Sequence, residues 1–425
     1  MSERAPVPRR ILLVTAYFPP DVGSAAHLFY DLGRVFAARG HQVTVVTGYP
    51  SYHAQGDLSR YTGKRLVETT AGMKVARVRV PELARNTPIG RGLWQFSCAR
   101  SFLKAALAEP APDVSLVYSP PLPLGLTALR LRSRRGAAVV INIQDLFPQS
   151  AIDLGVMRSR TLIRLFERLE SYLYRRADAI AVHSEGNRLH VTGRGGSQAW
   201  TRIMDNTVDT DEIRPGPRAN EMRRELGIGE RFAASFGGIM GFSQDLDVIL
   251  GAARVVQDQS DMVFLLAGEG VERERCEKKS RDLGLRNVIW LPMLPRDRYP
   301  RLLEASDVCL TTLRADVRTP VVPSKILSAM AAGRPILAAL DPAGDAPKLI
   351  ARAEAGFSLP PEDAEALAKA LLDLAARPEL CVRLGENGRR YAEEHLSPSG
   401  LARAYEGLFE EVLSARSGSR TESPR

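Results

Sequence analysis

Short apolar runs alternate along the chain with segments in which apolar residues recur every three or four positions. The first run, 11–17, is followed by an amphipathic segment at 27–39 and by a second apolar run at 42–47. A buried strand, a helix and a second strand in this order form a βαβ unit with parallel strands. The alternation continues through the first half of the chain and starts again after a polar stretch, 205–217, that is rich in Pro and Gly. It therefore predicts an α/β protein of two Rossmann-like domains.

The polar stretch near the midpoint marks the expected domain boundary. We assign residues 1–208 to an N-terminal domain and 209–396 to a C-terminal domain. A last helix is expected at 397–414, and the polar residues 415–425 are expected to form a disordered tail. Ligands of open α/β sheets bind beyond the carboxyl ends of the strands, so both domains should direct the loops after their strands at a central cleft.

Glycines stand in the loop after the first strand of each domain. Gly23 lies in the N-terminal loop, and Gly237, Gly238 and Gly241 lie in the loop at 237–244. Glycine lets the backbone approach a ligand closely, and the N-terminus of the following helix favours an anion. Neither loop has the spacing of a Walker loop or of a dinucleotide-binding motif. An ordinary tight turn is the alternative interpretation, and the pattern around Gly23 taken alone favours that alternative.

A lysine at the start of a predicted helix is the most informative residue of the C-terminal half. Ser324 follows Pro323 and is expected to cap a helix over 324–332, which places Lys325 in its first turn. A cation at this end is disfavoured by the helix dipole by roughly 0.3–1 kcal/mol. The position is explained if an anion binds at the helix N-terminus and is neutralised by the dipole and the lysine together. A solvent-exposed lysine is the alternative.

Composition limits the classes of protein that the chain can belong to. Of the 425 residues, 44% are apolar and 25% charged, which is typical of a globular protein and excludes wholesale disorder. The four cysteines are far apart, so neither a zinc site nor a disulfide framework is predicted, and a reducing compartment is indicated. No secretory signal and no membrane span is expected, because no apolar run is long enough. A net charge of +9 favours anionic partners, although no nucleic-acid-binding motif accompanies it.

A series of short motifs, in a fixed order from about residue 9 to 410, resembles one family. The chain resembles the retaining glycosyltransferases of family 4, which have the GT-B fold. Within that family it is similar to the bacterial fucosaminyltransferase-like and colanic-acid-type enzymes of lipopolysaccharide, capsule and exopolysaccharide assembly. The motifs that carry the resemblance are residues 19–23, 39–45, 144–148, 184–187, 206–209, 266–270, 306–308, 323–325 and 331–335.

The sequence departs from the family at the donor site. A pair of glutamates usually lies on either side of this loop, and here the matching positions hold Pro320 and Ser328. Many members also carry a basic residue in the loop where this chain has 242–244. We interpret these differences as those of a subfamily, within which a Pro-Ser-Lys such as 323–325 is frequent.

The resemblance implies retaining, metal-independent transfer of a sugar from a nucleoside-diphosphate sugar, UDP- or GDP-linked, to a glycan or polyprenyl-diphosphate-linked acceptor. No cofactor and no metal are expected.

The departing diphosphate gains negative charge in the transition state, which positioned donors must stabilise. Lys325 and Asp145 are the expected catalytic residues; Asp145 follows a strand and would orient the acceptor or act as a base, with a structural cap as the alternative. Expected donor contacts are Gly23, Gly237, Gly238, Gly241, Pro292, Met293, Leu294, Ser324, Lys325, Ser328, Gly344 and Asp345. Arg296, Arg314 and Arg318 are candidates for further cations, and the sequence favours the alternative that each is an ordinary exposed arginine.

His27 and Glu185 are the expected acceptor contacts, and His183 receives less weight because a lone histidine is more often structural. The resemblance also implies that the last helix returns to the N-terminal domain. A cytoplasmic location is expected, at the inner face of the plasma membrane if the chain meets lipid. The basic residues proposed for that contact are Arg77, Arg79, Arg85, Arg91, Arg100, Lys104, Arg130, Arg132, Arg134 and Arg135, interleaved with Leu93, Trp94, Phe96 and Phe102. A core face with solvated arginines is the alternative.

Two other functions stay open at this level. A nucleotide-sugar 2-epimerase would use the same fold, but it requires paired carboxylates and histidines, which the context of residues 323–325 fits poorly. A non-catalytic GT-B protein that acts as a binding partner or scaffold is favoured by the absence of the two glutamates.

Overall fold

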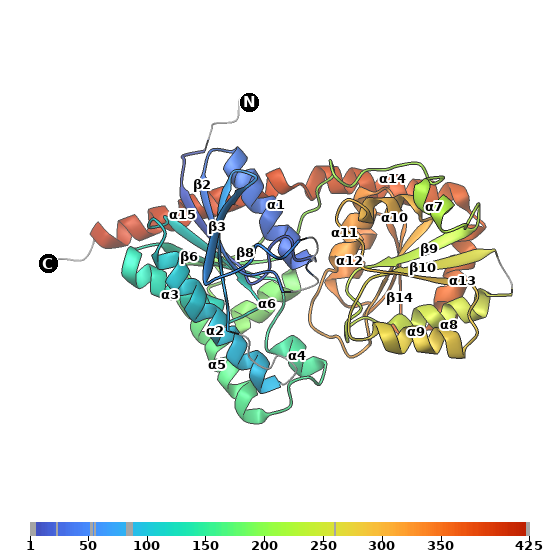
Figure 1. Cartoon of the computed structure of the whole chain (residues 1–425), viewed down its shortest axis with the longest axis horizontal. Coiled ribbons are helices and arrows are strands. Elements are labelled where there is room, and N and C mark those ends of the chain that lie inside the picture. Colours follow the sequence, from blue (N-terminus) through green and yellow to red (C-terminus); the bar gives the residue numbers. More distant parts are fainter. Residues whose placement is uncertain are drawn as a thin grey trace. The chain divides into compact units, whose positions relative to one another are not determined.

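The computed structural model describes residues 6–22, 24–51, 54, 57–81, 88–258 and 261–421, and the chain divides into two compact units (Figure 1). The first unit comprises residues 1–206 together with 398–425, and the second comprises 207–397. The division falls two residues before the expected boundary. The reason is that Val208 is buried in the core of the second unit and donates its backbone N–H to the carbonyl of Leu396 at 3.0 Å.

The first unit is built on an eight-stranded sheet in the order β3-β4-β2-β1-β5-β6-β7-β8. Neighbouring strands are parallel except for the antiparallel pair β3 and β4. The edge strand β3 was not predicted, because its side chains are half-exposed and largely polar. The strands are β1 (Arg10–Val14), β2 (Gln42–Gly48), β3 (Arg65–Thr70), β4 (Met73–Val78), β5 (Val114–Ser119), β6 (Ala138–Ile143), β7 (Ala179–Val182) and β8 (Thr201–Ile203).

Helices cover both faces of this sheet. One face carries α1 (Ser24–Ala38) and α15 (Pro398–Thr421), which pack on apolar residues of β1, β2, β5, β6 and β7. The other face carries α2 (Pro88–Leu107), α3 (Leu124–Arg135), α5 (Arg160–Arg176) and α6 (Glu185–Gly193). The short helix α4 (Gln149–Asp153) follows β6. Burial on both faces explains why the strands read as continuous apolar runs.

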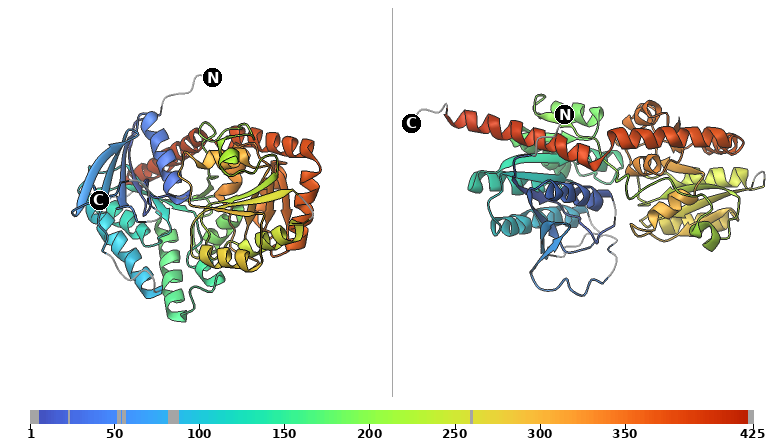
Figure 2. Two further views of the ribbon diagram at one scale, coloured as in Figure 1. Left: turned by 45° about the vertical axis from the view of Figure 1, so that its right-hand side comes forward. Right: turned by 90° about the horizontal axis from the view of Figure 1, so that it is seen from above.

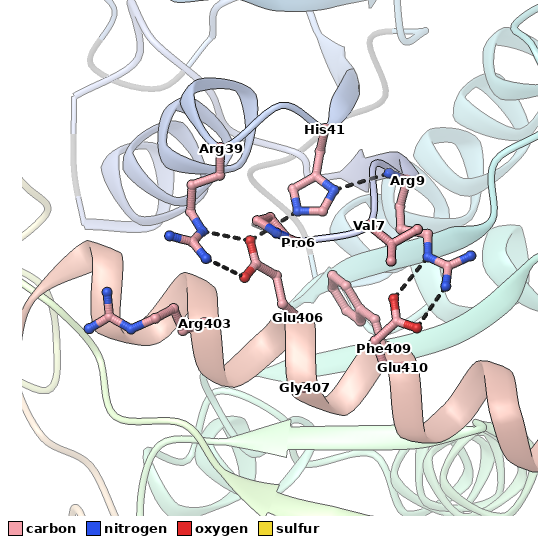
Figure 3. Close-up of a pocket in the computed structure, with 10 residues that line it drawn as sticks. All are labelled: Pro6, Val7, Arg9, Arg39, His41, Arg403, Glu406, Gly407, Phe409 and Glu410. Atoms are coloured by element: carbon pink, nitrogen blue, oxygen red, sulfur yellow. Dashed lines mark hydrogen bonds and ion pairs between the residues drawn. The ribbon is translucent and has the colours of Figure 1, made fainter. Parts of the chain in front are cut away.

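The C-terminal helix α15 is an integral part of the first unit. Tyr405 and Phe409 are fully buried, and the rings of Phe409 and Phe36 of α1 lie 5.8 Å apart. Ion pairs join the helix to the amino edge of the sheet: Arg39 Nε and Glu406 Oε1 are 2.7 Å apart, and Arg9 Nη2 and Glu410 Oε2 are 2.6 Å apart (Figure 3). Figures 1 and 2 show this helix lying along α1.

The expectation that residues from 415 onward form a disordered tail is wrong for the part that the structure describes, since α15 continues to Thr421. Arg416 anchors the extension: its Nη1 lies 2.8 Å from Asp178 Oδ2, and its Nη2 donates to the carbonyl of Gly136 at 3.0 Å. These contacts are long-range, so the polar composition of the segment gave no sign of them.

The second unit is built on a six-stranded parallel sheet in the order β11-β10-β9-β12-β13-β14. Its strands are β9 (Phe232–Gly237), β10 (Met262–Ala267), β11 (Val288–Leu291), β12 (Val308–Thr312), β13 (Ile336–Ala339) and β14 (Gly356–Leu359). Its helices are α7 (Glu221–Glu225), α8 (Leu246–Val256), α9 (Arg273–Asp282), α10 (Tyr299–Ala305), α11 (Ser324–Ala331), α12 (Asp345–Arg352), α13 (Ala364–Ala375) and α14 (Pro378–His395).

Some of the residues that were expected to contact lipid are buried in the core. Trp94 and Phe102 are buried in the core on the inner side of α2. Arg77 is also buried, and its Nε lies 2.6 Å from Glu68 Oε1. The expectation is therefore wrong for these residues, whereas Leu93 and Phe96 are exposed. Arg85 and the side chain of Arg91 lie outside the described residues. In the described part of the chain, no helix has the length and apolar character needed to cross a membrane.

We predict that Phe409→Ala destabilises the first unit by about 3–5 kcal/mol, because it empties a buried aromatic site. Urea unfolding followed by tryptophan fluorescence measures this in a Trp290→Phe background, where the remaining tryptophans, Trp94 and Trp200, belong to the first unit. Ser414→Ala, on the exposed side of the same helix, is the matched control and should leave the midpoint unchanged. An unchanged midpoint for Phe409→Ala would contradict the structural role of α15.

Candidate functional site

The strand order of the second unit reverses between β9 and β12. Strands β10 and β11 continue the sheet on one side of this point, and β13 and β14 continue it on the other. In open parallel sheets the loops that leave the two strands at such a reversal separate and form a ligand site. Here these are residues 238–245, which lead into α8, and residues 313–323, which lead into α11. The backbone N–H of Arg314 joins the loops by donating to the carbonyl of Ser243 at 3.1 Å.

Lys325, in the first turn of α11, reaches across to the loop after β9. Its Nζ donates to Gln244 Oε1 at 2.6 Å and lies 3.8 Å from the centre of the Phe236 ring. Among the described residues no carboxylate forms an ion pair with it. The side chain is partly buried, and removal from water lowers the pKa of Lys325 to about 7. The amine is therefore poised between its charged and neutral forms near neutral pH.

The N-terminus of α11 has no side-chain cap. The prediction that Ser324 caps this helix is wrong: Pro323 occupies the cap position and Ser324 is the first helical residue. The structure, for the residues it describes, shows no side-chain hydrogen bond at this cap. The fixed φ angle of Pro323 ends the preceding loop at that point. The first N–H groups of a helix have no acceptor within the helix, so here the positive end of the dipole and Lys325 face the same region.

Glycines allow two loops to touch at the carboxyl edge of this sheet. Gly268 and Gly270, after β10, have φ angles of +155° and +151°, and Gly238 has +128°. A Cβ on Gly268 would collide with the carbonyl of Gly238. The N–H of Met240 also donates to the carbonyl of Glu269 at 2.8 Å. Gly241, by contrast, has room for a side chain, with its nearest neighbour at 3.8 Å.

The other residues expected at the donor site lie in loops along the same edge. Residues 292–294 follow β11, and Gly344 and Asp345 begin α12 after β13, with Asp345 Oδ1 3.3 Å from Lys348 Nζ. The Ser328 hydroxyl lies one turn into α11 and donates to the carbonyl of Ser324 at 3.3 Å.

The three further arginines differ in whether a carboxylate of the chain neutralises their charge. Arg296 is paired with Glu212, with 2.6 Å between Nε and Oε1, and Arg314 is paired with Asp316, with 3.0 Å between Nη2 and Oδ2. Arg318 is exposed and forms no ion pair within the described part of the chain. Of these three, Arg318 is the cation that stays available to a ligand.

In the first unit, polar side chains gather after β6. Gln144 Nε2 donates to Asn142 Oδ1 at 2.9 Å, and Asn206 Nδ2 donates to Gln144 Oε1 at 2.8 Å. Asn142 Nδ2 in turn donates to the Tyr405 hydroxyl of α15 at 2.6 Å. The next residue, Asp145, is exposed, yet the protein atoms around its carboxyl remove enough water to raise its pKa, while the His183 imidazole acts in the opposite direction.

His183 is the residue that sequence reasoning undervalued. It is buried, its Nε2 lies 2.8 Å from the carbonyl of Gln144, and its Nδ1 has no hydrogen-bond partner among the described residues. Asn187, one turn into α6, has a buried Oδ1 that likewise lacks a partner in the part of the chain that the structure describes. The sequence contained a signal for this pair. His183 directly follows a buried strand, and Asn187 stands four residues later, so the two side chains are expected on the same face at the start of the following helix.

Two expected acceptor contacts are in different surroundings. Glu185, the first residue of α6, is exposed and paired with Arg188 of the same helix, with 2.6 Å between Oε1 and Nη2. His27 is partly buried on α1. Gly23 lies outside the described residues.

Comparison with known families matches a different model to each unit. Residues 23–207 match the glycosyl transferase 4-like domain, and residues 220–391 match the glycosyl transferases group 1. The probable glycosyltransferase WbjE of Pseudomonas aeruginosa is 27% identical over 295 residues, which cover 68% of this chain and 73% of WbjE. The putative colanic acid biosynthesis glycosyl transferase WcaI of Escherichia coli K12 is 24% identical over 341 residues, 76% of this chain and 81% of WcaI.

Solved structures share the fold. Sucrose-phosphate synthase from Thermosynechococcus elongatus superimposes with a TM-score of 0.76 at 18% identity, over 96% of this chain and all of that structure. Anabaena HepE, solved in complex with UDP and glucose, superimposes with a TM-score of 0.71 at 16% identity, over 95% of this chain and all of that structure. The predicted GT-B fold is thereby confirmed.

We predict that Gly268→Ala destabilises the second unit by about 3 kcal/mol or more, because the strain at a φ of +155° adds to the collision with Gly238. Gly284→Ala is the matched control: Gly284 has a φ of +63° and no neighbour within 4 Å, so only the strain of about 1–2 kcal/mol remains. Scanning calorimetry compares the two variants. Equal losses of stability would show that contact between the loops is unimportant.

Proposed function

Because the chain belongs to the family 4 glycosyltransferases, which have the GT-B fold and use nucleotide-sugar donors, we propose that it is a retaining, metal-independent enzyme of cell-surface polysaccharide biosynthesis. The acceptor is a glycan or a polyprenyl-diphosphate-linked sugar. The observation that supports the donor site is the N-terminus of α11, which has no side-chain cap, with Lys325 beside it and no carboxylate paired to that lysine among the described residues.

In this proposal the diphosphate of the donor lies at the start of α11. Departure of the nucleoside diphosphate places negative charge on its phosphate oxygens as the sugar becomes oxocarbenium-like. The N–H groups from Ser324 onward and the ammonium of Lys325 stabilise that charge where it develops. An amine with a pKa of about 7 is protonated fully once the anion binds beside it.

The remaining donor contacts follow from the loops at the carboxyl edge of the second unit. The backbone at Gly237, Gly238 and Gly241 approaches the phosphates or the sugar, and residues 292–294 hold the base. Ser328, Gly344 and Asp345 contact the sugar or ribose, and Arg318 supplies further positive charge. Backbone and lysine thus take over the role of the glutamates that Pro320 and Ser328 replace.

The first unit binds the acceptor. Asp145 orients the acceptor hydroxyl or accepts its proton, and its raised pKa brings it closer to neutral pH for that role. The buried, unpartnered Nδ1 of His183 supplies a polar contact beside it. His27 and Glu185 complete the acceptor site. The enzyme works in the cytoplasm, at the inner face of the membrane that carries a lipid-linked acceptor.

We predict that one of UDP, GDP, dTDP and ADP binds selectively and that EDTA does not weaken its binding. Lys325→Met should weaken the affinity at least about tenfold, since charge-assisted contacts contribute about 1.5–3 kcal/mol. Titration calorimetry measures this at pH 7. Lys369→Met, at an exposed lysine of the same unit, is the control with the same change in charge. Binding of none of the four nucleotides would refute the proposed donor site.

The pKa of Lys325 gives the binding a defined pH dependence. Below about pH 7 the lysine is charged with or without nucleotide, so the affinity should be constant. Above it, the free protein has lost the proton that the complex holds, and the affinity should fall by up to about tenfold per pH unit. Calorimetry from pH 6.5 to 9, in buffers of different ionisation enthalpy, reports the affinity and the proton uptake together. The result would contradict this account if Lys325→Met kept the same slope.

A further inference from the structure

The exposed face of α5 carries a row of three arginines. Arg164, Arg168 and Arg175 lie on the exposed face of this helix, at spacings of four and seven residues that place them along one line. Within the described chain none of them forms an ion pair or a hydrogen bond through its side chain. Other arginines of the first unit, such as Arg9 and Arg39, are neutralised by a carboxylate.

These arginines line a hollow between α5 and α6. It has a volume of about 370 Å³ and is lined by Arg164, Glu167, Arg168, Ser171, Arg175 and Arg194. Four guanidinium groups thus surround one carboxylate. The hollow has the size and the charge to hold a phosphate group with several donors.

Buried contacts hold the walls of the hollow in place. Glu170 of α5 is fully buried, and its Oε1 lies 2.9 Å from His190 Nε2 of α6. Arg194, just after α6, pairs with Glu167 at 3.0 Å between Nη2 and Oε1. Gly195 has a φ of +102°, and the side chain of Arg175 lies across it, so close that a Cβ there would stand 3.1 Å from Arg175 Cγ. These contacts hold Glu167, Arg194 and Arg175 in place, while Arg164 and Arg168 are exposed to solvent.

Apolar side chains stand beside this row on the same surface. Leu165 and Tyr172 are 51% and 43% exposed and run parallel to the arginines along α5. Phe96 of the neighbouring α2 continues the apolar strip, since its ring lies 6.1 Å from that of Phe166 of α5 (α2 and α5 in Figure 1). Leu93 of α2 is 55% exposed. Basic and large apolar residues side by side are typical of a helix that lies in a membrane interface.

We propose that this face of α5, with Arg194 and the exposed side of α2, docks on a membrane leaflet that carries anionic phospholipids. The hollow takes the phosphate of one headgroup, and Leu165, Tyr172, Phe96 and Leu93 enter the boundary with the acyl chains. The inference rests on the proposed function only in that a lipid-linked acceptor requires contact with a membrane. It assigns that contact to α5 and α6, whereas the basic residues of α3 serve as its control.

Vesicle sedimentation tests this assignment with the full chain. Wild type should bind vesicles of phosphatidylglycerol and phosphatidylcholine and leave vesicles of phosphatidylcholine alone unbound. Arg164→Gln combined with Arg168→Gln should weaken binding roughly 30-fold, because each basic residue near an anionic surface contributes about a factor of five. Arg130→Gln combined with Arg134→Gln is the matched control: these residues of α3 have the same spacing, are exposed and are equally unpaired, and should change binding less than about threefold.

Two further experiments distinguish apolar insertion into the membrane and binding of a free anion from binding of a lipid headgroup. Leu165→Ser combined with Tyr172→Ser should weaken binding to anionic vesicles at high salt, where the apolar term dominates. Inorganic phosphate that displaces the protein at low millimolar concentration would show that the hollow serves a free anion, and would overturn the lipid assignment. Equal losses for the two arginine pairs, or no binding by wild type, would overturn it as well. Nucleotide affinity in solution should be the same in all these variants, so a failed donor site is recognised separately from a failed docking surface.

Discussion

A parallel β-sheet must be covered on both faces, and in the first unit the end of the chain supplies part of that cover. The strands β5, β6 and β7 have apolar side chains on both faces, and on one of these faces α15 packs beside α1. The chain therefore leaves the first unit at Asn206, builds the whole second unit and returns at Pro398. The core of the first unit is incomplete until the last residues are in place.

The return of α15 also connects the two edges of the sheet. At the amino edge, Glu406 accepts from Arg39 and lies 2.9 Å from His41 Nε2, while Glu410 accepts from Arg9. These residues line a hollow of about 370 Å³ (Figure 3). Arg9, Arg39 and His41 each contact a carboxylate of α15 there, so these contacts join the helix to the sheet. Towards the carboxyl edge, Tyr405 meets Asn142, and the polar chain continues through Gln144 to Asn206. Through these hydrogen bonds α15 helps to hold Gln144, the residue that precedes Asp145, in its position.

The cations at the proposed ligand sites share one property, which other exposed arginines such as Arg130 and Arg134 also have within the described residues. Lys325, Arg318, and the row Arg164, Arg168 and Arg175 have no carboxylate partner within the described residues. Protein interiors and stable surfaces usually neutralise such groups, because an isolated charge that loses water is costly. An anion bound beside Lys325, Arg318 or this row would supply the counter-charge that the described residues do not.

The sequence by itself determined the order of strands and helices and the place of the loops that leave them. Periodicity is a local property, so apolar runs such as 138–143 and 232–237 match the observed strands β6 and β9. The same local signals located the start of α11 and the position of Lys325. Only the tertiary structure decided which polar groups find partners. Ser324 does not cap its helix, Arg77 and Arg296 are neutralised by carboxylates, and residues 415–421 are helical because Asp178, far away in the chain, binds Arg416. Long-range pairing leaves no pattern in neighbouring residues, and that is the physical reason why the sequence could not show which of its charges are neutralised within the chain.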